Sequence, residues 1–304
     1  MKLNKVSRRQ FIQWSATAAS AVLAAPAGLL AAAAVGKRTA ADQMTLGNTG
    51  IKLSRLGFGA GSNSGKVQRD LGHEAFNKLI RYAYDQGITY FDTAQGYQTH
   101  TWIREAVKGL PREKLYIQTK IGNPGADPLK VIDNFRKELD MDYVDSLLVH
   151  CATTHNWDDQ RKKLMDAVAE AQEKKWVRAR GVSCHSLPAL HRAGEIPWVQ
   201  VHLVRVNPQG TWVDTPAETV FAKSDPSHVP PIMDELKAMK AKGRGIIGMK
   251  MIGNGEFTKA EDREKAIRFA MQCGLLDAVV IGFKSPAEID EAIERINRAL
   301  AEKA

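Results

Sequence analysis

The chain of 304 residues can bury one large core or two modest ones, and its hydrophobic content of 44% and charged content of 25% are ordinary for a globular protein. The formal net charge of +9 does not indicate a nucleic-acid partner, because residues 1–41 hold six basic residues and no acidic one. The three cysteines have no metal-ligand spacing, so we expect no metal site, at most one disulfide, and buried free thiols as the simpler outcome.

Residues 1–41 have the pattern of an export signal. Arg8 and Arg9 precede an uncharged, alanine-rich run from Trp14 to Gly36, with small residues suited to cleavage beyond it. The paired arginines resemble the twin-arginine signal of bacteria, so we expect the Tat machinery to export the folded protein to the periplasm. The alternative is an uncleaved anchor. The run is only weakly hydrophobic, so we expect no stable membrane span after cleavage.

Residues 42–304 are expected to form one folded domain. Glycines between apolar positions predict a small hairpin over Met44–Leu53. Amphipathic stretches that indicate helices then alternate with apolar runs that predict strands, at Leu53–Phe58, Ile88–Phe91, Leu115–Thr119, Tyr143–Val149, Val177–Val182, Val199–Val206, Gly245–Met249 and Ala278–Ile281. This alternation predicts an α/β fold, a single (β/α)8 TIM barrel preceded by the hairpin. A doubly wound sheet is the alternative, but the glycines of 57–61 lack the dinucleotide-binding spacing.

Reactive side chains follow three successive predicted strands. Asp92 and Tyr97 come after the second strand, Lys120 after the third, and His150 after the fourth. In a barrel, the carboxyl ends of neighbouring strands meet at one mouth, where catalytic groups are found. A single strand-end Lys or Asp is usually a solvated cap. The coincidence of all four residues predicts one active site.

The segments F-D-T-A-Q-G-Y, I-Q-T-K, L-L-V-H, G-V-S-C-H and G-I-I-G-M-K resemble the aldo-keto reductase superfamily, whose members are (β/α)8 barrels that reduce carbonyls with a nicotinamide cofactor. The resemblance implies that Asp92, Tyr97, Lys120 and His150 form its catalytic tetrad. Hydride addition to a carbonyl leaves an alkoxide, and Tyr97 can protonate it. We expect Lys120 to lower the pKa of this phenol, Asp92 to hold Lys120, and His150 to orient the carbonyl.

The resemblance also implies a site for NADP or NAD. Its residues would be Ser183 and Cys184 after the fifth strand, Met249, Lys250 and Gly253 after the seventh, and Lys284, Ser285, Glu288 and Glu291 after the eighth. Arg205 is expected either to replace a family glutamine or to bind an acid. Glu288 stands where an arginine commonly holds the NADP 2′-phosphate, which favours NAD, whereas Lys284 and Ser285 favour the phosphate. Glu288 is equally suited to a helix start without any cofactor.

A long irregular loop from Asn207 to Pro230 is predicted to lie over the mouth. Trp212 is expected to form one wall of the substrate pocket and Trp157 the opposite wall. The expected substrate is a small carbonyl or alcohol, namely an aldehyde, a ketone or a sugar. The alternatives are a non-catalytic nucleotide-binding barrel and a cofactor-free barrel lyase or isomerase. No soluble nicotinamide pool is expected outside the cytoplasm, so we hypothesise that the cofactor is retained and serves one substrate that is oxidised and another that is reduced.

Overall fold

A computed structural model describes residues 37–302 of the chain, so nearly all of the predicted signal lies outside the described residues. The chain divides into two compact units, Met1–Lys37 and Arg38–Ala304. Among residues 37–302, no helix has both the length and the apolar composition that a membrane crossing requires.

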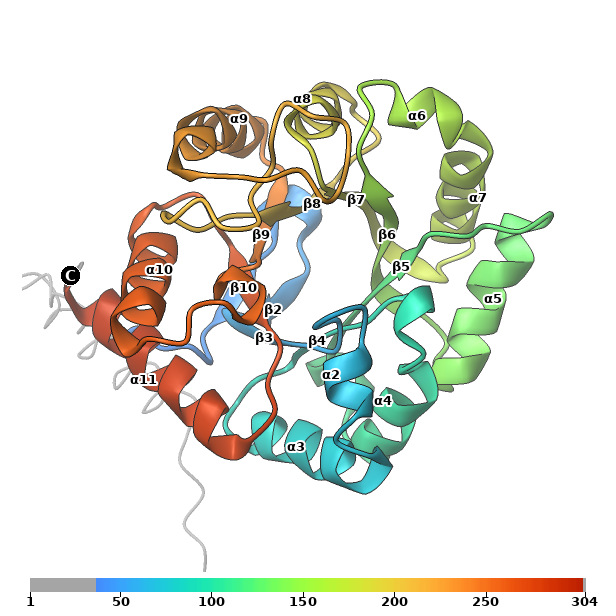
Figure 1. The fold of residues 1–304 in the computed structure, drawn as a ribbon. Helices are drawn as coiled ribbons and strands as arrows, with labels where there is room; N and C mark the ends of the chain where they lie inside the picture. Colours follow the sequence, from blue (N-terminus) through green and yellow to red (C-terminus); the bar gives the residue numbers. More distant parts are fainter. Residues whose placement is uncertain (1–36, 303–304) are drawn as a thin grey trace, which may run out of the picture. The chain divides into compact units, whose positions relative to one another are not determined.

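Eight parallel strands close into a barrel that is surrounded by helices (Figure 1). The strands are β3 (Leu56–Gly59), β4 (Tyr90–Asp92), β5 (Tyr116–Ile121), β6 (Val144–Ala152), β7 (Val177–Cys184), β8 (Val201–Arg205), β9 (Gly245–Met249) and β10 (Ala278–Ile281). Each strand pairs with the next one, and β10 pairs with β3. The prediction of a single TIM barrel is therefore confirmed.

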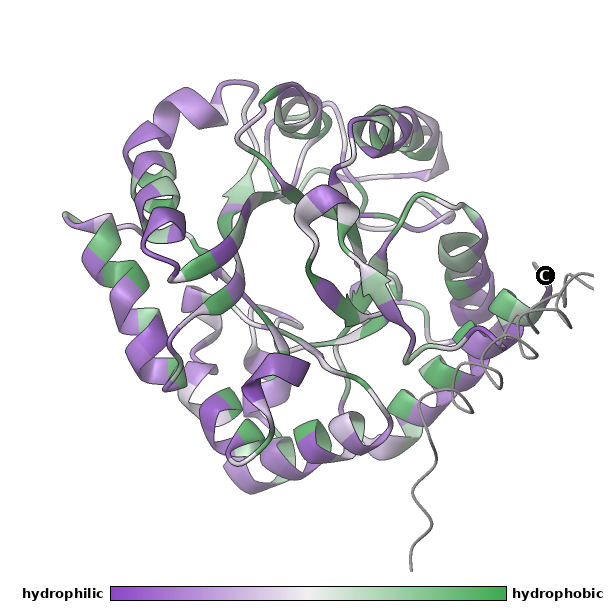
Figure 2. Ribbon diagram, turned by 180° about the vertical axis from the view of Figure 1, so that it is seen from behind, coloured by the Kyte–Doolittle hydropathy of each residue, from purple (hydrophilic) through white to green (hydrophobic). Residues whose placement is uncertain are grey.

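The helices follow the strands in the expected alternation. They are α2 (Lys66–Arg69), α3 (His73–Asp85), α4 (His100–Val107), α5 (Pro128–Leu139), α6 (Trp157–Gln160), α7 (Lys162–Glu173), α8 (Leu187–Glu195), α9 (Val229–Ala241), α10 (Ala260–Gln272) and α11 (Pro286–Glu302). Each long helix buries one apolar stripe; in α3 it comprises Phe76, Leu79, Ile80 and Ala83. Figure 2 shows hydrophobic and hydrophilic residues alternating along these helices. The buried stripes cover the outside of the strands and form the larger apolar core.

The predicted hairpin is present and lies at the amino-terminal ends of the strands. Its strands, β1 (Gln43–Thr45) and β2 (Lys52–Ser54), are antiparallel. Leu46 packs against Gly245 at the start of β9, and Leu46 and Leu53 share an apolar cluster with inward-facing barrel residues. The hairpin therefore supports the end of the barrel away from the strands' carboxyl ends. The expected strand Leu53–Phe58 is interrupted at Arg55, where the Ser54 hydroxyl donates to the carbonyl oxygen of Leu56 and accepts from the Thr89 amide.

Residues 38–42 belong to the barrel unit. The Arg38 guanidinium donates to the carbonyl oxygen of Leu300 at 3.0 Å, and the Ala40 amide donates to Asn297 at 2.8 Å, so both contact α11. Ala40 is buried in the core between helices and strands. Residues 38–40 are thus held against the barrel unit by their contacts with α11.

Candidate active site

The four predicted catalytic residues lie at the carboxyl ends of three neighbouring strands. Asp92 is the last residue of β4, and Tyr97 follows in the 3-10 turn η2 (Gln95–Tyr97). Lys120 lies at the end of β5 and His150 near the end of β6. Because β5 pairs with both β4 and β6, the barrel brings these side chains together at one mouth.

Asp92 and Lys120 form a buried ion pair. The Lys120 ammonium donates to both carboxylate oxygens of Asp92 at 2.7 Å and to the carbonyl oxygen of Thr93 at 2.8 Å. The Lys120 and Asp92 side chains are 1% and 6% exposed. An ammonium has three donors, so these bonds use all of them.

A chain of hydrogen bonds supports Asp92 from inside the barrel, and the sequence reasoning did not assign it. The Gln118 amide donates to Asp92 at 2.7 Å and to the Tyr90 hydroxyl at 2.8 Å. Ser146 donates to the Gln118 carbonyl oxygen and accepts from Tyr116. The signal was a polar residue at an inward position of the I-Q-T-K strand, two residues before Lys120.

The Tyr97 ring is held by contacts on several sides. Its hydroxyl lies 3.4 Å from Nε2 of His150, and the Lys120 ammonium lies over the ring, 4.9 Å from the centroid. Arg69 donates to the Tyr97 carbonyl oxygen. Gly61 approaches so closely that a Cβ atom there would lie 2.5 Å from a ring carbon. These contacts fix where the phenol meets a ligand.

The pKa of Tyr97 is raised in this structure, whereas we expected Lys120 to lower it. Burial raises it well above the usual value, because the phenolate loses its hydration, and the charges of Asp92 and Cys151 act in the same direction. Tyr97 therefore keeps its proton at neutral pH, which suits a proton donor.

His150 is neutral in this environment. Burial lowers the pKa of His150 to about 3, and the positive charges of Lys120 and Lys250 add to the effect. A neutral imidazole offers one N–H donor and one acceptor. His150 can thus donate to a carbonyl oxygen from one ring nitrogen without carrying a charge.

His185 is a second imidazole near the site, and the sequence reasoning gave it no role. It follows β7, and its ring centroid lies 6.5 Å from that of His150. Its Nδ1 atom is buried with no hydrogen-bond partner among residues 37–302. The only sequence signal was its place at the end of the G-V-S-C-H segment.

Arg205 does not have either of its expected roles in this structure. Its guanidinium donates to Asp214 at 2.6 Å and to the carbonyl oxygens of His185 and Val220. The Arg205 side chain is 2% exposed and that of Asp214 is fully buried. Arg205 therefore bonds the long loop to the residue that follows β7, and its guanidinium is not free to bind an acid.

A pocket of about 500 Å³ runs from the tetrad to the start of α11. Asp92, Tyr97 and Lys120 line one part of it. Five of the residues assigned to the cofactor also line it: Met249, Lys250, Lys284, Glu288 and Glu291. The tetrad and these residues therefore share one continuous space.

The other four residues assigned to the cofactor are not among those that line this pocket. Cys184 lies in the core between strands and helices, because alternation along β7 turns it outward, and its Sγ atom contacts the carbonyl oxygen of Ala189. Ser183 is buried and accepts from the Cys151 amide. Gly253 lies against the Phe257 ring. Ser285 accepts from the Glu288 amide at the start of α11.

The expectation that Trp157 forms a pocket wall is wrong. Trp157 is 2% exposed in the core outside the barrel, and its indole donates to the carbonyl oxygen of Ala189. It starts α6, and this short helix directs the ring inward beneath α8.

Trp212 lies on the predicted loop, where its side chain bonds this loop to a neighbouring one. We call residues 207–225 the strap. The Trp212 indole donates to Glu256 at 2.6 Å, and Gln209 donates to the carbonyl oxygen of Asp262 at 2.8 Å. At another point, Glu218 accepts from the His155 amide at 2.7 Å. The strap is therefore tied to the β9–α10 loop and to the β6–α6 loop.

The comparisons with known proteins agree with this architecture. Residues 55–269 match the model of the aldo/keto reductase family. The chain belongs to the aldo/keto reductase family. It is an oxidoreductase of that family. Among residues 37–302, no group of three or more His, Cys, Asp or Glu side chains is arranged to hold a metal ion.

Two relatives and one solved structure illustrate the similarity. "Probable aldo-keto reductase 1" of Glycine max is 28% identical over 171 residues, which cover 51% of this chain and 49% of the relative, so the match spans about half of that protein. L-galactose dehydrogenase of Arabidopsis thaliana is 24% identical over 298 residues, with 85% and 89% covered. The holo form of aldo-keto reductase AKR11C1 from Bacillus halodurans has a TM-score of 0.67 at 15% identity, with 86% and 96% covered, which shows the shared fold.

Proposed function

We propose that this protein transfers a hydride between a nicotinamide cofactor, NAD or NADP, and a small carbonyl or alcohol substrate, with Tyr97 as the general acid. The observation that carries the proposal is the continuity of the pocket. Asp92, Tyr97 and Lys120 line the same space as Lys250, Glu288 and Glu291. One elongated ligand can therefore meet the proton donor at one end and the start of α11 at the other.

The residues of the pocket fit a nicotinamide dinucleotide. Lys250 donates to Asn254 at 2.7 Å, and within the described part of the chain no carboxylate lies within ion-pair distance of it. Burial lowers the pKa of Lys250 to about 8, and the nearby charge of Arg205 contributes. A half-buried cation without a counter-ion favours an anionic group such as a pyrophosphate. The bound nicotinamide would supply the hydride in reduction and accept it in oxidation.

The side chains of this chain supply the proton chemistry. In reduction, the Tyr97 hydroxyl donates its proton to the oxygen that gains negative charge, and the neutral His150 donates a hydrogen bond to the same oxygen. Asp92 holds the Lys120 ammonium in place over the Tyr97 ring. In oxidation the same residues act in reverse, with Tyr97 as the base.

The names of the two relatives favour two substrate classes. The Arabidopsis relative is named for the oxidation of a sugar, and the soybean relative for aldo-keto reduction. We propose an aldehyde, a ketone or a sugar as the substrate of this chain. A non-catalytic nucleotide-binding barrel is the second candidate. The buried, fully bonded Asp92–Lys120 pair beside Tyr97 argues against it, because nucleotide binding alone needs no such pair.

We further propose that the signal in residues 1–41 directs export through the Tat pathway to the periplasm with the nucleotide already bound. The strap supports retention, because Trp212 ties it to the β9–α10 loop, which lines the pocket, and Gln209 ties it to the first turn of α10. The test is mass and absorbance analysis of nucleotide released from protein purified from the periplasm. A stoichiometric nicotinamide nucleotide supports the proposal, and protein without nucleotide that binds it loosely contradicts retention.

The function itself is tested with Tyr97→Phe, which removes only the hydroxyl. We expect this variant to bind NAD or NADP as the wild type does and to lose turnover of a panel of aldehydes, ketones and sugars. Tyr82→Phe is the matched control, since its hydroxyl lies outside the pocket and bonds to Asp290 at 2.7 Å. Unchanged turnover in Tyr97→Phe, or a wild-type protein that ignores both nucleotides, would refute the proposed function.

A further inference from the structure

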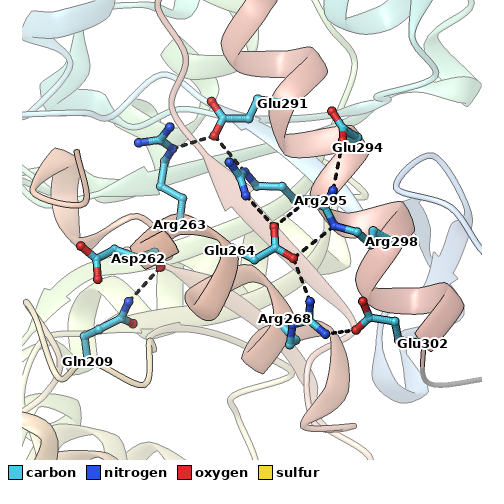
Figure 3. Close-up of polar contacts among 10 residues, drawn as sticks. All are labelled: Gln209, Asp262, Arg263, Glu264, Arg268, Glu291, Glu294, Arg295, Arg298 and Glu302. Atoms are coloured by element: carbon cyan, nitrogen blue, oxygen red, sulfur yellow. Dashed lines mark hydrogen bonds and ion pairs between the residues drawn. The ribbon is translucent and has the colours of Figure 1, made fainter. Parts of the chain in front are cut away.

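The end of the pocket that lies between α10 and α11 is built from paired charges. Arg263, Glu288, Glu291 and Arg295 all line it. Figure 3 shows that Arg263 and Arg295 converge on Glu291, while Arg295 also reaches Glu264. The residues of α11 form the end of the pocket away from the tetrad. This end would therefore meet the adenosine half of a dinucleotide whose nicotinamide lies at Tyr97.

Each guanidinium in this part of the pocket is already committed. Nε of Arg263 donates to Glu291 at 2.8 Å, and its Nη1 atom donates to the carbonyl oxygens of Phe257 and Thr258. Arg295 donates to Glu291 at 2.8 Å and to Glu264 at 2.5 Å. Glu291 therefore offsets the charge of Arg263, and a phosphate that took Nε or Nη1 of Arg263 would break bonds to Glu291 or to the β9–α10 loop.

The wider network leaves no excess of positive charge. Its four arginines are balanced by four glutamates, and the outer members Arg268 and Arg298 both bind Glu264 (Figure 3). Lys284 lies 3.7 Å from Glu288 and is largely exposed, and the same glutamate accepts from the Lys284 amide at 2.7 Å. The cations near the start of α11 are thus matched by carboxylates.

A 2′-phosphate fits this environment poorly. It carries close to two negative charges at neutral pH and would approach the carboxylates of Glu288 and Glu291. Like charges at such short range repel each other in water and do so more strongly in a partly buried site. A free 2′-hydroxyl has the opposite preference, because it can donate a hydrogen bond to a carboxylate.

Building on the proposed function, we propose that Glu288 and Glu291 make this protein selective for NAD(H) over NADP(H), by accepting a hydrogen bond from the ribose 2′-hydroxyl and repelling a 2′-phosphate. Glu288 is the residue that discriminates directly, since its carboxylate lies at the open start of α11 and is 39% exposed. Glu291 acts with it by keeping Arg263 and Arg295 engaged.

The test is calorimetric titration of nucleotide-free protein with NAD+ and NADP+, which requires no turnover. We expect NAD+ to bind about tenfold more tightly or better, equivalent to about 1.4 kcal/mol. Glu288→Gln should strengthen NADP+ binding and lower the ratio of the NADP+ dissociation constant to the NAD+ dissociation constant by about fivefold. The ratio should also narrow when ionic strength rises from about 0.05 M to about 0.5 M, because salt screens the repulsion.

Glu294→Gln is the matched control, because Glu294 lies two turns along the same helix, bonds Arg298 and does not line the pocket. It removes the same charge and should leave the ratio unchanged. Equal or tighter binding of NADP+ by the wild type would overturn the selectivity and leave the proposed function standing. An unchanged ratio in Glu288→Gln would overturn the assignment to Glu288. Failure of both nucleotides to bind would instead refute the proposed function.

Discussion

The buried pair of Asp92 and Lys120 makes a quantitative prediction. Asp92→Asn keeps the shape of the side chain but leaves the Lys120 ammonium, 1% exposed, without its carboxylate. Breaking a buried, hydrogen-bonded pair in this way costs about 3–5 kcal/mol. For a domain of this size that corresponds to a fall in melting temperature of about 6–20 °C. In this variant Lys120 is expected to lose its charge, because burial lowers its pKa and the Asp92 carboxylate no longer opposes that effect.

Urea unfolding of four proteins measures the pair energy: the wild type, Asp92→Asn, Lys120→Met and the double variant. We expect the double variant to be more stable than the sum of the single losses predicts, by about 1–3 kcal/mol, because it leaves no unpaired charge. Asp166→Asn is the surface control. It breaks the exposed Lys162–Asp166 pair and should cost less than about 0.5 kcal/mol. A loss below about 1 kcal/mol in Asp92→Asn, or strict additivity, would refute the reasoning.

Four further predictions concern the site and the start of the folded unit. Burial raises the pKa of Tyr97 and lowers that of His150 to about 3, so kcat/KM for carbonyl reduction should stay constant through neutral pH and fall only at alkaline pH. The kcat/KM for alcohol oxidation should instead rise with pH. A decrease in the reduction profile below pH ~6.5 would contradict this. Gly61→Ala places a Cβ atom 2.5 Å from the Tyr97 ring and should lower kcat/KM by about 100-fold in a steady-state assay, whereas Gly96→Ala meets nothing within 4 Å and should change it little. Trp212→Phe removes the bond to Glu256 and should speed nucleotide release about fivefold in stopped-flow fluorescence, while Trp198→Phe, which loses a bond to Met165 on the helix side, should not. Intact mass of the exported protein should show a mature chain that starts at or before Arg38, because removing residues 38–40 would cost the contacts with Leu300 and Asn297; a start at Asp42 would contradict this.

The fold was predictable because its signals are local and repeated. The expected strands Gly245–Met249 and Ala278–Ile281 coincide with β9 and β10, since each is a short apolar run bounded by turn residues. The amphipathic stretch Glu74–Asp85 matches α3 to within one residue. The interruption at Arg55 was not predictable, because it depends on the Ser54 hydroxyl bonding to Thr89 and Tyr90, which are distant in sequence.

The site was predictable in its members but not in its electrostatics. Types and strand-end positions were enough to bring Asp92, Tyr97, Lys120 and His150 to one mouth. The pKa of Tyr97 depends instead on burial and on the nearby charges of Asp92 and Cys151, and neither can be read from a motif. Trp157 was misplaced for a related reason, since a tryptophan after a strand can face the mouth or the helix layer, and only the packing decides.

The charged groups of the pocket follow one pattern that links the proposals. Asp92 neutralises Lys120, and Glu291 holds Arg263 and Arg295. Within the described residues that line the pocket, Lys250 is a half-buried cation that these carboxylates leave unpaired. A ligand that matches this pattern is anionic near Lys250 and needs no further anionic group at the start of α11. NAD, whose charge lies on its central pyrophosphate, meets both conditions, and the added 2′-phosphate of NADP violates the second.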